Sequence, residues 1–242
     1  MRTTSIALTT GIASAAVLLW PTMARAQPPA AADALPTFDY RDCPPIPAGL
    51  DRAKWRCEVH VASGTVKIGT AATTPFTITA MTHAEGPLPD GTSGQVFAGL
   101  RGGTTRVPGG LLGLPLGIRP ESAGSADLLT PGGLIEMKFR LVSPLLGGRC
   151  TLGSNAEPVK IGLSLVPGSA VWVSQDPPIR RMDGTDTTFA VPRARGCGPF
   201  ARLLDHRFGL PSPSGGNSLA IRAYYSYKTY DTIPAAQPNA GR

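Results

Sequence analysis

Residues 81–91, MTHAEGPLPDG, bring together three side chains that are common in catalytic and metal-binding sites: His83, Glu85 and Asp90. His83 and Glu85 are two residues apart, so a strand would place both on one face. A catalytic zinc ion usually takes three protein ligands and keeps one open position. Asp90 or His60 would therefore have to complete the set by folding. This arrangement defines one hypothesis, a metal-assisted or acid–base hydrolase that uses His83, Glu85 and Asp90.

The same residues also have a structural interpretation. The segment GPLPDG contains two prolines and ends in Asp-Gly, which is characteristic of a turn. The helical HExxH pattern is absent, and so is the CxxC pair of the zinc deaminases. The sequence therefore favours a strand that runs into an exposed loop with polar residues at its mouth, and it assigns no metal and no cofactor.

Other catalytic patterns are missing. There is no GxSxG elbow, no phosphate-binding loop and no conspicuous carboxylate pair. Besides His83, the chain has two histidines. His60 follows Glu58 on the polar face of an expected strand, and His206 lies in an expected helix, so both are expected at the surface. The sequence leaves open whether the protein is an enzyme and favours a non-catalytic role.

Two features suggest binding instead. Residues 108–118, PGGLLGLPLGI, form an apolar run broken by Gly and Pro. If exposed, this run would contact a lipid, a membrane surface or a partner protein; the alternative is a loop folded back over the core. A tyrosine cluster near the C-terminus forms either a ligand platform or ordinary cross-strand packing. The candidate binding residues are Leu111, Leu112, Leu114, Ile118 and Tyr224.

The N-terminus predicts export. Residues 1–26 have the basic start, short apolar run and Ala-x-Ala ending of a secretory signal peptide, with cleavage near Ala26–Gln27 by the general secretory route. Residues 27–38 read as a disordered Ala/Pro linker, 39–231 as a single β-rich domain and 232–242 as a flexible tail. No later segment is apolar enough to span a membrane. We therefore expect a secreted, extracellular protein.

The net charge and the distribution of basic residues limit the classes of partner that we expect. The predicted signal peptide contains two of the 23 basic residues and none of the 16 acidic ones, so the net charge falls from +7 to +5. The basic residues are scattered and form no stripe with interleaved aromatics, which argues against nucleic acid. A cell-envelope component or another protein remains as the expected partner.

Four cysteines in an exported chain predict two disulfides. Of the three connectivities, Cys43–Cys57 with Cys150–Cys197 is favoured because the first pair closes a short local loop. A zinc site is the alternative, but no CxxC pair occurs.

Alternating residues predict short antiparallel strands. The clearest is residues 134–143, and others cover 57–69, 75–82, 187–192 and 217–230. Cys57 and Val59 are expected to face the core, opposite Glu58 and His60; further inward residues are Phe76, Ile78 and Ala80. Residues 100–133 show no sustained period. One helix is expected at residues 199–208, with an apolar stripe of Phe200, Leu203, Leu204 and Phe208 and with Gly209 as its C-cap. Together these elements predict an all-β antiparallel sandwich, with a β-barrel as the runner-up.

Three segments carry a resemblance to known proteins: DCPPIPAGLDRAKWRCEV, THAEGPLPDG, and PRARGCGPF with the later FGLPSPSGGNSL. In these segments the chain resembles a group of uncharacterised secreted proteins from high-GC actinomycete bacteria, which have no assigned activity. The resemblance covers most of the expected mature chain. It implies export, and it transfers no catalytic residue.

Overall fold

The computed structural model describes residues 34–130 and 133–233, and a compact unit begins at Pro36. The predicted signal peptide, most of the predicted linker and most of the predicted tail lie outside the described residues. Phe38 from the expected linker and Ile233 from the expected tail both pack against buried side chains. No described helix is long and apolar enough to cross a membrane.

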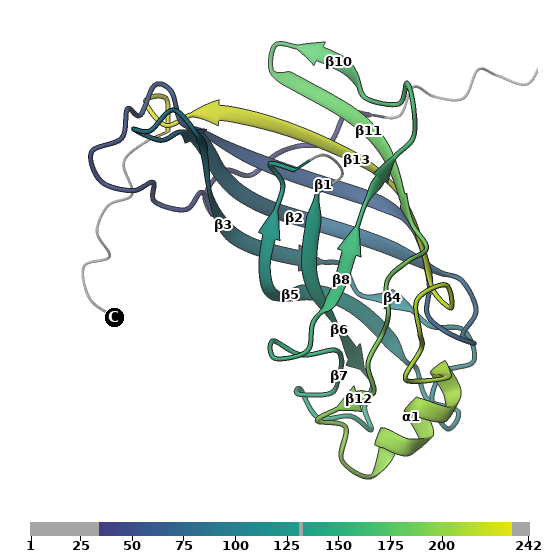
Figure 1. Cartoon of the computed structure of the whole chain (residues 1–242). Coiled ribbons are helices and arrows are strands. Elements are labelled where there is room, and N and C mark those ends of the chain that lie inside the picture. Colours follow the sequence, from purple (N-terminus) through teal and green to yellow (C-terminus); the bar gives the residue numbers. More distant parts are fainter. Residues whose placement is uncertain (1–33, 131–132, 234–242) are drawn as a thin grey trace, which may run out of the picture. The chain divides into compact units, whose positions relative to one another are not determined.

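The described residues form thirteen strands and one short helical segment (Figure 1). The strands are β1 (Arg56–Lys67), β2 (Thr74–Pro87), β3 (Ser93–Gly102), β4 (Thr105–Arg106), β5 (Gly117–Asp127), β6 (Leu134–Val142), β7 (Thr151–Leu152), β8 (Val159–Gly162), β9 (Ser164–Leu165), β10 (Val171–Gln175), β11 (Pro178–Asp186), β12 (Ala194–Arg195) and β13 (Ser218–Thr229). A 3₁₀ turn, η1 (Gly198–Phe200), leads into α1 (Ala201–Phe208).

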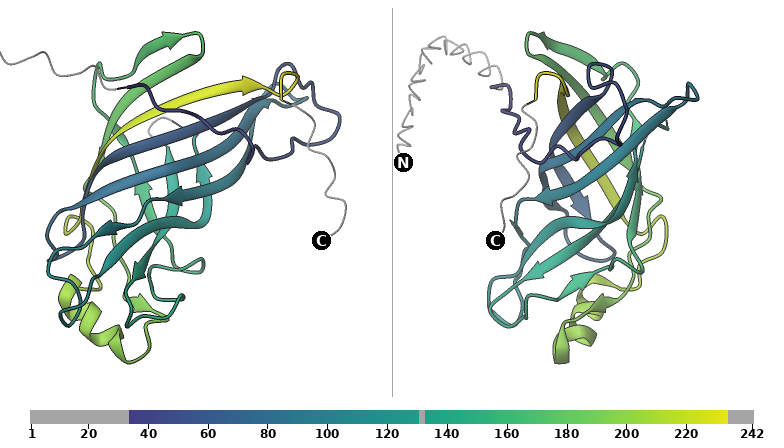
Figure 2. Two further views of the ribbon diagram at one scale, coloured as in Figure 1. Left: turned by 180° about the vertical axis from the view of Figure 1, so that it is seen from behind. Right: turned by 90° about the vertical axis from the view of Figure 1, so that its left-hand side faces the viewer.

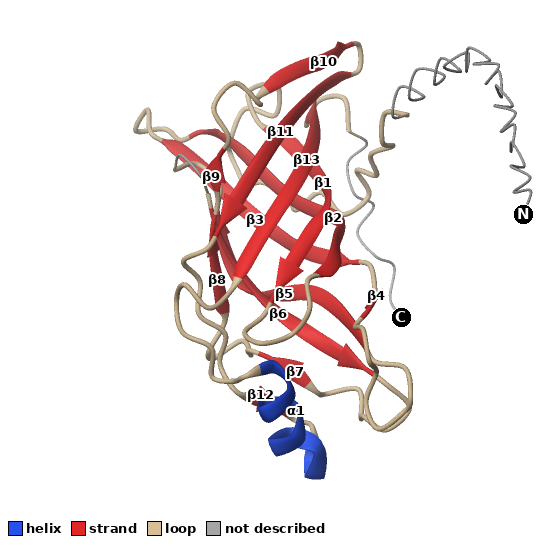
Figure 3. Cartoon of the chain, turned by 90° about the vertical axis from the view of Figure 1, so that its right-hand side faces the viewer, coloured by secondary structure: helices blue, strands red, loops and turns tan. Residues whose placement is uncertain are grey.

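All thirteen strands belong to one antiparallel sheet, in which ten follow the order β10-β11-β13-β1-β2-β3-β5-β6-β7-β12 and β4, β8 and β9 pair with β5, β6 and β11. The sheet curls until its two sides face each other (Figures 2 and 3). The chain from β8 to β9 joins those sides, because β8 pairs with β6 whereas β9 pairs with β11. The expected all-β antiparallel fold is confirmed, and its facing layers are parts of a single continuous sheet.

The main core lies on the inside of this curl. Phe76 and Phe139 meet edge to face with their ring centroids 6.4 Å apart. The helix α1 adds Leu204 and Phe208 to this core, and Gly209 ends it in the left-handed conformation at φ 65°. The expected helix and its C-cap are thus confirmed. Leu203, expected in the apolar stripe, is exposed instead.

Two segments differ from the sequence-based strands. Strand β5 lies inside the region that showed no sustained period, and its pairing with β6 shifts register between Ser122 and Ala126. Its proline, glycines and charged residues hid it, because pairing with β6 outweighs the weak strand propensity of these residues. Conversely, residues 187–192 form no strand and contribute only an isolated bridge from Val191 to Ser212.

A second, smaller core lies under the N-terminal segment. Trp55, Cys57, Val59, Ala84 and Tyr230 are buried there. They pack against side chains of that segment, including Phe38, Tyr40, Ile46 and Leu50. The Cys43–Cys57 disulfide ties the segment to β1, and Cys150–Cys197 links the residue before β7 to the residue before η1. Both expected pairings are confirmed. In the chain-entropy model each stabilises the fold by roughly 3–4 kcal/mol.

The irregular strand β5 is fastened to β6 by charge. Arg140 donates from Nε and Nη2 to the two carboxylate oxygens of Glu121 at 2.6 and 2.9 Å, and Arg119 donates to Oε1 at 2.9 Å. Burial raises the pKa of Glu121, but the hydrogen bonds from Arg140 and Arg119 outweigh it and hold the pKa below its usual value. Glu121 therefore stabilises the fold in its ionised form.

We predict that Glu121→Gln lowers the free energy of unfolding by roughly 0.5–1 kcal/mol at pH 7, the range of partly exposed ion pairs. Because the folded pKa lies below the unfolded pKa, the contribution is complete above about pH 4.3 and is lost as pH falls through the folded value. Urea unfolding of both proteins at pH 7 and pH 3 measures this, with Glu157→Gln in an exposed pair as the control. A gap that is unchanged at pH 3 would contradict the assignment.

Candidate functional site

The curled sheet encloses a partly open cavity of about 390 Å³. One part of its wall is apolar and is supplied mainly by Ala62, Ile78, Met81, Ile135, Leu163, Met182, Ile221 and Ala223. The other part is polar and consists of Arg56, Glu58, His60, His83, Glu85, Arg180 and Tyr225. Small-molecule sites in proteins typically combine an apolar pocket of this size range with a few placed polar groups.

The polar wall follows from the alternation of β1. Cys57 and Val59 face outward into the second core, so Glu58 and His60 must face the inside of the sheet. Strand β1 therefore has no solvated face here, because one side is covered by the N-terminal segment and the other lines the cavity. The expected orientation of this strand, with Cys57 and Val59 toward the main core and His60 in solvent, is wrong for that reason.

A β-bulge in β2 determines which way the remaining polar side chains, His83 and Glu85, point. Between His60 and Ala62 of β1, the pairing passes three positions on β2, from Met81 to Ile78. The extra residue changes which side chains face inward, so that Met81 takes the inward place expected for Ala80. His83 and Glu85 then also face the cavity.

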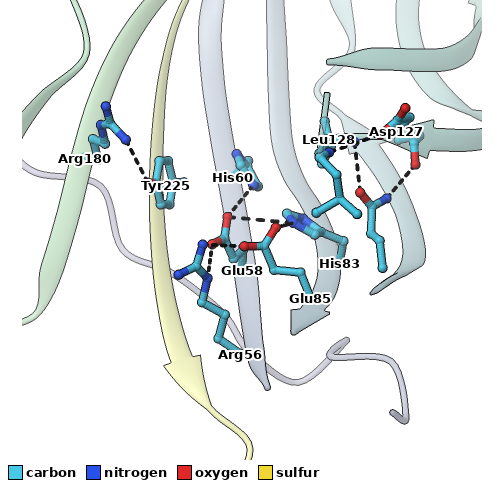
Figure 4. Close-up of polar contacts among 12 residues, drawn as sticks. Arg56, Glu58, His60, His83, Glu85, Asp127, Leu128, Arg180 and Tyr225 are labelled. Atoms are coloured by element: carbon cyan, nitrogen blue, oxygen red, sulfur yellow. Dashed lines mark hydrogen bonds and ion pairs between the residues drawn. The ribbon is translucent and has the colours of Figure 1, made fainter. Parts of the chain in front are cut away.

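Register places these groups opposite one another. Arg56 pairs with Glu85 and Glu58 pairs with His83 across β1 and β2, while His60 lies opposite Tyr225 of β13. The imidazole rings of His60 and His83 stack with centroids 5.2 Å apart. The residues thus form a continuous polar surface on three neighbouring strands (Figure 4).

In both Glu58 and Glu85, the two carboxylate oxygens contact different partners. Arg56 contacts Oε1 of Glu58 at 2.6 Å and also contacts Oε1 of Glu85. Oε2 of Glu58 lies 3.5 Å from His60 Nε2 and 3.7 Å from His83 Nε2. Oε2 of Glu85 lies 3.3 Å from His83 Nε2. Each carboxylate therefore has one oxygen toward Arg56 and one toward the histidines.

Burial and charge set the ionisation of this wall. His83 is 1% exposed, and the side chain of Glu58 is 7% exposed. Burial lowers the pKa of His60, because desolvation penalises the imidazolium, and the contact with Glu58 only partly opposes this. Burial would raise the pKa of Glu58, but the neighbouring side chains of His60, His83 and Arg56 hold it below its usual value. At neutral pH the site therefore contains a neutral His60 beside an ionised Glu58.

Arg180 supplies a separate cation at the cavity. Its Nη1 lies 3.5 Å from the hydroxyl of Tyr225, and its guanidinium lies over the ring of Trp172 at 5.8 Å. Within the described part of the chain, no carboxylate pairs with Arg180. The guanidinium is therefore held by aromatic contacts while its charge is left unneutralised.

The residues expected from MTHAEGPLPDG separate in the structure. His83 and Glu85 line the cavity, whereas Asp90 lies in the exposed loop after β2 and accepts hydrogen bonds from the backbone and hydroxyl of Thr92. Asp90 thus belongs to the turn that GPLPDG predicts. Glu58 and His60 take its place beside the pair. His60 is one of the residues that the sequence offers as a third member, whereas no motif points to Glu58.

The other binding candidates lie outside this cavity. In the apolar run at 108–118, Leu111 and Ile118 are buried, while Leu112 and Leu114 are 68% and 38% exposed. Leu116 is buried as well, so the run contributes three side chains to the core, while most of its residues are exposed and two of its leucines face solvent. Tyr224 is half-buried between β1 and β11, opposite Val61 and Arg181.

Comparisons of the chain with protein-family models, curated proteins and solved structures give no match.

We predict that Arg56→Met destabilises the protein by about 2 kcal/mol at pH 7. The substitution leaves two largely buried carboxylates without their cation, and the half-exposed position of Arg56 reduces the usual cost of breaking a buried pair. Adding Glu85→Gln to Arg56→Met should restore part of the loss by removing one unpaired charge. Denaturant unfolding of both variants, with Arg202→Met on the exposed face of α1 as control, measures the effect. Equal stability of the Arg56 and Arg202 variants would refute the role given to Arg56.

Proposed function

We propose that the protein is an extracellular binding protein that takes a small amphipathic anion into the cavity. The observation that carries this proposal is the division of the cavity wall into an apolar part and a polar part that includes the unneutralised Arg180. An apolar ligand body would displace water from Ile135, Met182 and Ile221. Its carboxylate, sulfonate or phosphate would pair with the Arg180 guanidinium.

The expected location of the protein agrees with this proposal. Two disulfides fit an extracellular protein. The predicted signal peptide and the resemblance to secreted actinomycete proteins support export. A role at the cell envelope follows if the bound molecule derives from lipid or wall material.

A second candidate function is hydrolysis, favoured by the gathering of Glu58 and His60 beside His83 and Glu85. A neutral imidazole next to a carboxylate can act as a general base. In this candidate, His60 would remove a proton from water and Glu58 would stabilise the resulting imidazolium. Hydrolysis of p-nitrophenyl acetate that falls at least tenfold in His60→Gln, but not in His206→Gln, would favour the enzyme over the binding protein.

The binding proposal predicts that the protein enhances the fluorescence of 1-anilinonaphthalene-8-sulfonate, an amphipathic anion. Arg180→Gln should weaken this binding about tenfold, because a charge-assisted contact contributes about 1.5 kcal/mol or more. Ala223→Phe should abolish binding by filling the apolar part of the cavity. Thermal unfolding of each variant separates lost binding from lost folding.

Leu112→Ala is the matched control, because Leu112 is exposed outside the cavity. Its affinity for the dye should equal that of the unmodified protein. The opposite pattern, with affinity lost in Leu112→Ala and retained in Arg180→Gln, would reject the cavity and favour the apolar run at 108–118 as the binding surface.

A further inference from the structure

Potential metal-ligand atoms of three side chains, Glu58, His60 and His83, gather at one part of the cavity wall, and Oε2 of Glu85 lies 3.3 Å from Nε2 of His83. Glu58, His60 and His83 each offer an atom within 4.8 Å of the others. Neighbouring ligands around a tetrahedral zinc ion with bonds of about 2.1 Å lie about 3.4 Å apart. The separations of 3.5, 3.7 and 3.3 Å within the set are close to that spacing.

The cluster is also incomplete by itself. Glu58 Oε1, His60 Nε2 and His83 Nδ1 are shielded from solvent and make no hydrogen bond of ordinary geometry to any described residue. Glu58 Oε1 forms an ion pair with Arg56, and His60 Nε2 lies 3.5 Å from the other oxygen of Glu58. Buried polar groups in proteins are nearly always satisfied. Of these three atoms, His60 Nε2 is the one that faces the proposed ion, and it is the atom that lacks a partner there.

The charge of the wall indicates the sign of that partner. At the cluster itself, the carboxylates of Glu58 and Glu85 outnumber the single guanidinium of Arg56, which favours a cation there, whereas Arg180 contacts Tyr225 and Trp172 instead. Imidazole and carboxylate together suit divalent first-row transition metals rather than Mg²⁺ or Ca²⁺, which prefer oxygen ligands alone.

We propose that Glu58, His60, His83 and Glu85 form a binding site for one divalent transition-metal ion of the zinc type. Arg56 is the positioning residue, because it holds Oε1 of both carboxylates and leaves both Oε2 atoms toward the ion. Such outer contacts orient metal ligands in proteins generally. An ion here would take the lone pairs of the Nε2 atoms, with each imidazole ligand carrying its proton on Nδ1. This inference goes beyond the amphipathic ligand and does not depend on it.

The test is a titration of the purified, chelator-treated full chain with Zn²⁺ in a calorimeter. We expect one ion per chain. Glu58→Gln and His60→Gln should each weaken binding at least tenfold, with circular dichroism to show that the variants fold. His206→Gln is the matched control, since it removes the exposed histidine on α1 and should leave the affinity unchanged.

Substitution with Co²⁺ gives a second readout, because a visible absorption band reports imidazole and carboxylate coordination and should change in Glu58→Gln. Arg180→Gln should keep its affinity for Zn²⁺ while losing the anilinonaphthalene dye, so the two proposals fail separately. Absence of stoichiometric Zn²⁺ binding would overturn the proposal. So would binding that survives both Glu58→Gln and His60→Gln but disappears in His206→Gln.

Discussion

The N-terminal segment that covers the outer face of β1 determines the rest of this structure. The Cys43–Cys57 disulfide fastens the segment to the strand, and Trp55, Val59 and Tyr230 pack beneath it. Because strand side chains alternate, burying Cys57 and Val59 outward leaves no choice but to turn Glu58 inward. The cover on the outside of the sheet thus creates the polar wall on the inside.

A polar wall inside a protein has an energetic cost that the fold must offset. Desolvating a carboxylate is unfavourable by several kcal/mol, and Arg56 offsets this for Glu58 and Glu85 together. Replacing the whole set by apolar residues of similar volume would commonly be neutral or stabilising. A cluster of ionisable groups retained in a cavity is therefore better explained by binding or chemistry than by stability. Both proposals made for this wall use that argument, one through Arg180 and one through the histidine–glutamate set.

Part of the fold could be predicted from local patterns. Strand β6 alternates cleanly because one of its faces packs on the core and the other carries charged side chains. Gly209 marks the end of α1 because only a left-handed residue closes that helix, and the local disulfide loop follows from cysteine spacing. In each case the structure is determined by residues that are near one another in sequence.

The site could be predicted only in part, because it depends on contacts distant in sequence. Alternation shows that Glu58 and His60 share a face, but not which face is covered by residues from before β1. The bulge turns His83 and Glu85 inward, but no turn-forming residue in the sequence indicates its position. Strand β5 depends on pairing with β6, which its own proline and glycines oppose. The local sequence therefore identifies ionisable residues that share a strand face, whereas tertiary packing determines whether that face lines the cavity.

The central claim is that His60 belongs to a buried polar wall rather than to the surface. Nuclear magnetic resonance of the imidazole nitrogens, followed as a function of pH, tests this most directly. The structure predicts that His60 is neutral at pH 7 and takes up its proton below about pH 6.5, the value for a histidine in a model peptide, because burial lowers its pKa. A His60 that titrates at or above that value would show that burial does not dominate its ionisation, and it would contradict the account.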